Sequence, residues 1–156
     1  QLAIEGEMAI SVGENCEIEA TLPVIELHNF IFRSDKKTLS ELIANNGINA
    51  GIVLPETKWK ESTKYIRDSG VLTLSINGSD IGNAGLWPND GGSEESLIWL
   101  KNNLIEYGIE LVPGDIVLAG TALGLYPVKD GDEIVVFIDG EPAVNCSIKT
   151  PHTTSI

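Results

Sequence analysis

The sequence predicts an α+β fold dominated by strands: a folded-over antiparallel or mixed sheet accompanied by two or three short helices. Residues 2–12 alternate between apolar and small or acidic side chains, with the period of a strand. Short strand patterns bounded by Gly-, Pro- and Asn-rich turns recur along the rest of the chain. Helix start signals followed by helical apolar spacing are fewer. The length predicts one domain over residues 1–150, with a loose tail at 151–156.

The first third of the chain alternates between strands and short helical segments. After the strand at 2–12, Gly13-Glu14-Asn15 predicts a turn. Four further elements follow: a short helical turn over 17–22 limited by Pro23, an extended segment over 25–32, a helix over 39–45 and a buried strand over 48–54. The helix is predicted by the capping box Thr38-Leu39-Ser40-Glu41 and by Asn46-Gly47, which stops it.

The rest of the chain begins with a hairpin, because Asn77-Gly78 separates two strand patterns over 71–76 and 80–85. Ser93 is the predicted N-cap of a helix, with two glutamates in its first turn. Leu97, Leu100 and Leu104 give that helix its apolar stripe, and Gly108 ends it. Three strands are expected last, over 116–118, 133–138 and 143–148.

Composition and charge restrict the partners. A formal net charge of −13 argues against nucleic acid and anionic membranes, since phosphate contacts need a basic patch. The one basic cluster contains acidic residues and is interpreted as a solvated face; it comprises Lys58, Lys60, Lys64 and Arg67. The apolar runs are strand-sized, and no signal peptide is recognisable, so we expect a cytoplasmic protein without a membrane span.

The two cysteines and the first residue bear on where the protein works and on how much of it is present. Cys16 and Cys146 match no metal or redox spacing, so free thiols are the simpler interpretation, and a disulfide between them stays open. The chain begins at Gln1 and enters a strand pattern at once. Either residues were removed, or only part of a longer polypeptide is present.

Glu5 and Glu7 are the strongest candidates for a functional site. Residues i and i+2 of a strand point to the same face, so these two carboxylates project side by side. Adjacent carboxylates repel one another unless a cation lies between them. A third carboxylate, Glu26, would complete an oxygen site suited to Mg²⁺ or Mn²⁺. The alternative is a solvated strand face, because the acidic pairs at Glu17/Glu19 and at 130/132 have the same spacing.

Five motifs in order resemble the fumarylacetoacetate hydrolase superfamily, in particular its 2-keto-4-pentenoate hydratase branch, which includes the 4-oxalocrotonate decarboxylases. The longest is Leu111-Val112-Pro113-Gly114-Asp115-Ile116-Val117-Leu118-Ala119-Gly120-Thr121, followed by Pro127-Val128-Lys129-Asp130-Gly131-Asp132. The others are the segments 4–10, 22–29, 44–51 and 99–102. The resemblance covers roughly residues 2–148 and implies the fold of that superfamily's C-terminal catalytic core.

The resemblance also implies roles for individual residues. Glu5, Glu7 and Glu26 fall on the superfamily's metal ligands. Gly120, Thr121 and Asn46 fall on segments that face the substrate, although Thr121 can equally be a plain turn residue. His28, two residues after Glu26, is the nearest candidate for a general base, against the alternative of a structural histidine.

Three departures from the pattern bear on activity. Asn29 and Asn45 stand where the superfamily has aspartates, and the serine of its A-D-N-A-S segment has no clear counterpart. The spacing from Glu7 to Glu26 is short for the hydratase branch. The upstream segment that carries the superfamily's catalytic lysine has no match in this sequence.

The leading hypothesis is a Mg²⁺- or Mn²⁺-dependent lyase, a hydratase or decarboxylase acting on small 2-keto or 2-hydroxydienoic acids of aromatic catabolism. The alternatives are an acylpyruvate-type hydrolase on the same metal site, and a non-catalytic homologue serving in assembly. The resemblance also implies a homo-oligomer.

Overall fold

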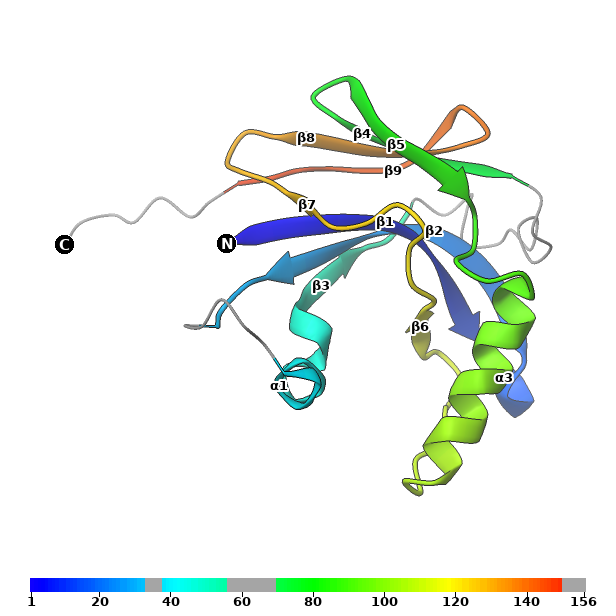
Figure 1. Cartoon of the computed structure of the whole chain (residues 1–156). Helices are drawn as coiled ribbons and strands as arrows, with labels where there is room; N and C mark the ends of the chain where they lie inside the picture. The colour runs from blue at the N-terminus through cyan, green and yellow to red at the C-terminus, as the bar shows by residue number, and fades with distance from the viewer. Residues whose placement is uncertain (33–37, 56–69, 150–156) are drawn as a thin grey trace.

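The computed structural model describes residues 1–32, 38–55 and 70–149, and two β-sheets form its body (Figure 1). The first sheet has the order β3 (Asn49–Val53), β2 (Ile18–Asn29), β1 (Leu2–Val12) and β6 (Ile116–Leu118), and β7 (Tyr126–Pro127) also pairs with β1. The second sheet has the order β5 (Ser79–Gly85), β4 (Val71–Ile76), β8 (Glu133–Ile138) and β9 (Glu141–Ser147). Every ladder between the described strands is antiparallel. Of the two predicted sheet types, antiparallel and mixed, the described strands form the antiparallel one.

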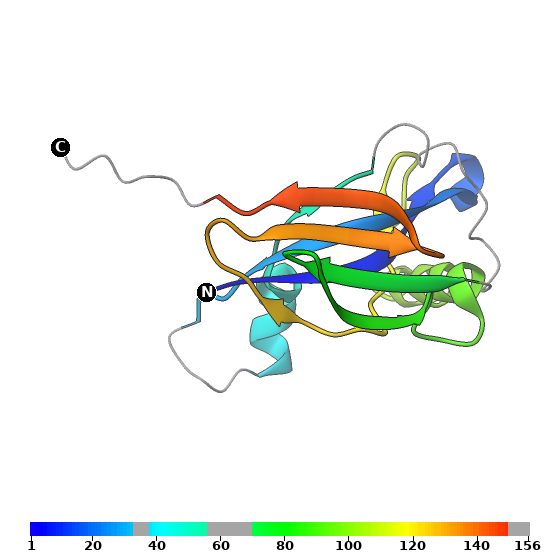
Figure 2. The ribbon, with the colours of Figure 1, turned by 90° about the horizontal axis from the view of Figure 1, so that it is seen from above.

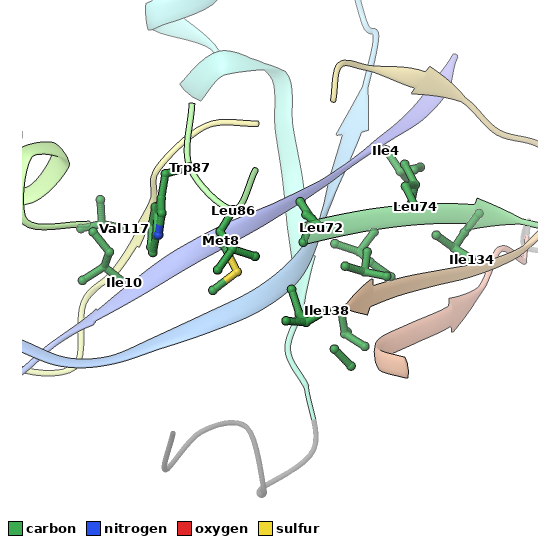
Figure 3. Packing of buried hydrophobic residues seen from close by; sticks show 14 of the residues in the cluster. Ile4, Met8, Ile10, Leu72, Leu74, Leu86, Trp87, Val117, Ile134 and Ile138 are labelled. Atoms are coloured by element: carbon green, nitrogen blue, oxygen red, sulfur yellow. The ribbon is translucent and has the colours of Figure 1, made fainter. Parts of the chain in front are cut away.

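The main core lies between the two sheets. Alternation along β1 directs Ile4, Met8 and Ile10 toward the second sheet, where they meet side chains such as Leu74 and Ile134 (Figure 3). All five of these side chains are fully buried. Burial of each stabilises the fold by about 1.5–3 kcal/mol. The other face of β1, which carries Glu5 and Glu7, therefore points away from this core.

Two helices lie on that other side of the first sheet, below it in Figure 1. Helix α1 (Leu39–Ala44) begins at the predicted capping box, in which the Thr38 hydroxyl accepts from the Glu41 N–H and Glu41 accepts in return. A 3₁₀ turn, η2 (Asn46–Ile48), links it to β3. Helix α3 (Gly92–Ile105) runs beneath the other end of the sheet. Seen from above, α1 and α3 lie under opposite ends of β1 (Figure 2).

Most predicted elements are confirmed, including the hairpin, where Asn77 and Gly78 have the positive φ values (53° and 77°) of a primed turn. The helical turn over 17–22 is wrong, because this segment pairs with β1 as the start of β2, after the 3₁₀ turn η1 (Glu14–Cys16). Pro23 is tolerated there, since β3 pairs only with the later part of β2 and leaves an edge beside it.

Two further details of the prediction are wrong. The strand expected to be buried over 48–54 is an edge strand, β3, and none of its residues is fully buried. Ser93 is not the N-cap of α3: the cap is Gly91, because a turn from Gly92 N–H to the Asn89 carbonyl already leads into the helix.

Cys16 and Cys146 are free thiols, so the disulfide that the sequence left open is not formed. The basic cluster at 58–67 and the tail from 151 lie outside the described residues. In the described part of the chain, no helix is long and apolar enough to cross a membrane.

Gly6, between the two carboxylates in sequence, lies against side chains of the second sheet. A Cβ at this position would lie 3.0 Å from Cγ2 of Val136 and 3.5 Å from Cδ1 of Leu74. Gly6→Val is therefore expected to lower the free energy of unfolding by about 1–3 kcal/mol through overpacking, measured by urea denaturation. Gly85→Ala is the control, because nothing lies within 4 Å of its Cβ. Equal effects of both substitutions would contradict this account.

Candidate metal centre

The β1–β2 ladder brings three of the predicted residues together. Glu5 lies directly opposite Glu26, and His28 lies opposite Ala3, two positions along. Because alternate residues share a face, His28, Glu26, Glu5 and Glu7 all project from the side of the sheet that faces away from the main core. Glu7 is fully buried, Glu26 and His28 are buried, and Glu5 is partly buried.

The distances place His28 within this cluster. Its Nε2 lies 3.3 Å from Oε2 of Glu26 and 3.6 Å from Oε2 of Glu5. One possible ligand atom from each of Glu5, Glu26 and His28 lies within 4.8 Å of the other two. Both ring nitrogens of His28 are buried, and neither makes a hydrogen bond within the described part of the protein. The imidazole is therefore available as a further ligand or as a base, beyond the three carboxylates predicted from the sequence.

Glu7 is the most strongly perturbed group of the cluster. Burial raises the pKa of Glu7 to about 9, and the hydrogen bond to Glu26 and the charge of Glu26 act in the same direction. The Gly120 N–H donates to Oε2 of Glu7 over 2.7 Å and opposes this rise in pKa. Oε1 of Glu7 is buried and accepts no hydrogen bond from the described residues. An orphaned carboxylate oxygen in such a place indicates a missing cation or proton.

Glu5, which is partly buried, adds a third carboxylate beside Glu7 and Glu26. Burial raises the pKa of Glu5, the His28 side chain lowers it, and the Glu26 carboxylate raises it. Three carboxylates within reach of one another are stable together only with a proton or a cation among them. Oxygen donors of this kind suit Mg²⁺ or Mn²⁺, so the residues present fit the predicted metal.

Asn49 holds one of these carboxylates in place. Its side-chain amide donates to Oε1 of Glu26 over 2.7 Å. A bulge in the β2–β3 ladder makes this contact: Leu27 pairs with Gly51 and His28 with Asn49, so Ala50 is an extra residue. Without the bulge, Ala50 would face His28 and Asn49 would point to the opposite face. The sequence analysis missed Asn49, because a bulge leaves no mark in an apolar pattern.

The predicted substrate residues lie around the cluster. Gly120 directs its N–H to Glu7, so this group orients a carboxylate of the site. The Thr121 hydroxyl donates to the Gly6 carbonyl over 2.7 Å and accepts from the Leu123 N–H over 3.0 Å, which ties this turn to β1. Asn46 is exposed in η2 and lines a groove that Glu26 also lines.

The two residues that depart from the superfamily pattern lie outside the cluster. Asn29 is exposed at the end of β2. Asn45 caps the C-terminus of α1, where its side-chain amide donates to the Glu41 carbonyl over 2.8 Å. Neither replacement removes a carboxylate from the group formed by Glu5, Glu7 and Glu26.

Comparison with known proteins agrees with this picture. No family model matches the chain. The chain is 24% identical over 131 residues to 2-hydroxyhexa-2,4-dienoate hydratase of Comamonas testosteroni, covering 84% of the chain and 48% of that protein. It is 23% identical over 160 residues to 2-oxo-hept-4-ene-1,7-dioate hydratase of Escherichia coli, covering 86% and 55%. The chain thus spans about half the length of these curated relatives.

Solved structures share the fold. The 4-oxalocrotonate decarboxylase from Pseudomonas putida G7, complexed with magnesium and adipate, superposes with a TM-score of 0.77 at 20% identity, over 92% of this chain and 59% of that one. The fumarylpyruvate hydrolase from Pseudomonas aeruginosa, in complex with Mn²⁺ and pyruvate, gives 0.62 at 16% identity, over 96% and 66%. A yeast protein of the fumarylacetoacetate hydrolase family gives 0.56 at 18% identity, over 96% and 68%. The chain has the fold of that superfamily, and the predicted resemblance to its hydratase and decarboxylase branch is confirmed.

Removal of the Asn49 amide is expected to weaken metal binding indirectly, because this amide holds the proposed ligand Glu26 in place. Asn49→Ala frees Glu26 to rotate, and losses of about 10–100-fold in affinity are usual when such a partner of a ligand is removed. Calorimetric titration with Mn²⁺ measures the effect. Asn29→Ala is the control, since Asn29 is exposed and on the neighbouring strand. An unchanged dissociation constant for Asn49→Ala would contradict this role.

Proposed function

We propose that this chain carries the metal centre of a Mg²⁺- or Mn²⁺-dependent lyase, a hydratase or decarboxylase acting on small 2-keto or 2-hydroxydienoic acids. The observation that carries the proposal is the group of buried Glu7 and Glu26 and partly buried Glu5 beside His28 on one sheet face. The curated relatives are hydratases of such acids, and solved structures with this fold hold magnesium or Mn²⁺.

The residues of the chain divide the work between them. Glu5, Glu7 and Glu26 would hold the cation, and Gly120 and Asn49 orient two of these carboxylates through their hydrogen bonds. When bound, the cation supplies a Lewis acid for the adjacent carboxylate and keto oxygens of the substrate and offsets the negative charge that develops there. His28 is positioned to accept or donate a proton at Nε2, which faces Glu5 and Glu26. The backbone N–H groups of the turn at Thr121 remain candidates for binding the substrate carboxylate.

A hydrolase that cleaves a carbon–carbon bond of an acylpyruvate is the second candidate. The observation that favours it is the shared fold of the fumarylpyruvate hydrolase in complex with Mn²⁺ and pyruvate. The two reactions use the same metal centre and differ in products. A hydratase adds water to a double bond without breaking the chain, whereas a hydrolase releases two acids. Product analysis by NMR distinguishes them.

A cytoplasmic homo-oligomer remains the expected assembly.

The proposal is tested by calorimetric titration of Mn²⁺, with and without oxalate as a mimic of a chelating 2-keto acid. Saturable binding that oxalate tightens is the expected result. Mn²⁺ that binds without any effect of oxalate would indicate a metal site with no open position for a substrate. No saturable binding would favour the non-catalytic homologue.

A further inference from the structure

His28 lies in the candidate metal centre with both ring nitrogens unsatisfied. The residue is only 6% exposed. Neither Nδ1 nor Nε2 makes a hydrogen bond to any residue that the structure describes. A buried polar nitrogen without a partner destabilises the folded protein, so such groups are usually satisfied by a ligand where no protein group does so. The environment of the ring shows which ligand this is.

Nε2 is the nitrogen that faces the carboxylates. It lies 3.3 Å from Oε2 of Glu26 and 3.6 Å from Oε2 of Glu5. Hydrogen bonds from N–H to oxygen are about 2.7–3.2 Å long, so both distances exceed that range. Two ligand atoms about 2.1 Å from one ion, at the tetrahedral angle, lie about 3.4 Å apart. The observed distances lie on either side of this value, as expected for atoms that share a cation.

The pairing of the strands positions the ring for this role. His28 follows Glu26 by two positions on β2, so the two side chains share a face. In the β1–β2 ladder Glu5 lies opposite Glu26, and the small residue Ala3 lies opposite His28. The Asn49 amide donates to Oε1 of Glu26, which leaves Oε2, the oxygen nearest the ring, for a cation. One ligand atom from each of Glu5, Glu26 and His28 lies within 4.8 Å of the other two.

An imidazole ligand changes which ion the centre prefers. Carboxylate oxygens suit Mg²⁺ and Mn²⁺, whereas imidazole nitrogen suits Zn²⁺, Fe²⁺ and Ni²⁺. We propose, on the basis of the metal centre in the proposed function, that Nε2 of His28 is a ligand beside Glu5 and Glu26 and that it favours a transition ion such as Zn²⁺ over Mg²⁺. With Mg²⁺, which prefers oxygen, the ring stays free for the proton transfer described above.

X-ray absorption spectroscopy of the protein loaded with one equivalent of Zn²⁺ tests the assignment directly. Zinc-bound imidazole produces a multiple-scattering pattern that carboxylates do not. The chain has two histidines, so His152→Gln leaves His28 as the only one without any change in the site. We expect the imidazole pattern in this variant, prepared without a histidine tag. Zn²⁺ bound by oxygen alone would overturn the proposal.

Calorimetry connects the imidazole to the choice of ion. Zn²⁺ and Mg²⁺ both form bonds of about 2.0–2.2 Å to oxygen, so the two ions differ mainly in their affinity for nitrogen. His28→Gln should weaken Zn²⁺ binding at least about tenfold, since loss of even a partner of a ligand costs about 10–100-fold. Mg²⁺ binding should change by less than about twofold, because oxygen ligands hold that ion.

His152→Gln is the matched control for this comparison, and it should change the affinity for neither ion. Urea denaturation in EDTA establishes that His28→Gln is folded. Equal losses of Zn²⁺ and Mg²⁺ affinity in His28→Gln would show that the ring supports the carboxylates without selecting the ion, which contradicts the proposal. The spectroscopic measurement on His152→Gln decides the ligand even if His28→Gln does not fold.

The outcomes separate this proposal from the one it rests on. If oxalate tightens Mn²⁺ binding but zinc-bound imidazole is absent, His28 is not a ligand and the proposed function stands. If the imidazole is bound but oxalate has no effect, His28 is a ligand of a centre that holds no 2-keto acid, and the proposed function alone fails. If neither Zn²⁺ nor Mn²⁺ binds, both fail.

Discussion

Glu7→Gln is expected to abolish Mn²⁺ binding and, at the same time, to raise the free energy of unfolding of the metal-free protein. The loss of binding follows from the removal of one of three anionic ligands from a buried site. The gain in stability follows from the raised pKa of Glu7, which is fully buried: near neutral pH the folded protein must retain on this carboxyl a proton that the unfolded chain releases. The glutamine oxygen can keep the bond from Gly120, its amide can donate to Glu26, and no proton has to be retained. A gain of about 1–3 kcal/mol near pH 7 matches this cost.

The combination of effects makes Glu7→Gln informative. A structural residue would lose stability when replaced, and a surface carboxylate would change neither quantity. Calorimetry with Mn²⁺ and urea denaturation in EDTA measure the two effects on the same sample. Glu17→Gln is the matched control, because Glu17 belongs to the other acidic pair of the first strands and is exposed. Loss of both stability and binding would indicate that Glu7 is needed for folding and not specifically for metal.

The strand pairs and the carboxylate cluster could be predicted from the sequence, because they depend on periodicity that the chain displays. Alternation over 2–12 identifies the face of Glu5 and Glu7, and the structure confirms that this face points away from the main core. Glu26 could be added only through the resemblance to a family. Nothing local in the sequence shows that it lies opposite Glu5, since this depends on the register of β1 and β2.

The errors in the prediction have physical causes. Residues 18–23 extend a strand that already pairs with β1, so tertiary pairing overrides the helical turn predicted over 17–22. Asn49 reaches Glu26 only because one residue is bulged out of β3. The groove beneath the sheet is equally hidden from the sequence, because it depends on where α3 lies relative to β6.

The metal-free protein is expected to lose stability as pH rises from about 5 to 8. Glu7 has a pKa of about 9 in the folded protein, against 4.5 for the unconstrained group. Between these values the unfolded chain releases a proton that the native state retains, so the native state binds more protons. The free energy of unfolding then falls with pH by about 1.4 kcal/mol per unit for one such group. Below pH 4.5 Glu7 is protonated in both the folded and the unfolded state, so it adds no pH dependence there. Urea denaturation in EDTA at several pH values measures the slope.

Bound Mn²⁺ should cancel this dependence, since the metal requires Glu7 in its ionised form and the bound native state then holds no extra proton on this group. Binding then displaces the proton of Glu7, and the apparent affinity rises by up to about tenfold per pH unit in the same range. The stability added by saturating Mn²⁺ is therefore expected to grow with pH while the metal-free stability declines. Glu7→Gln should flatten the metal-free curve relative to the unmodified chain, whereas Glu17→Gln should leave it unchanged. A metal-free stability that rises through this range, with the same slope in Glu7→Gln, would show that Glu7 is already ionised in the folded protein and that its charge is balanced without a cation.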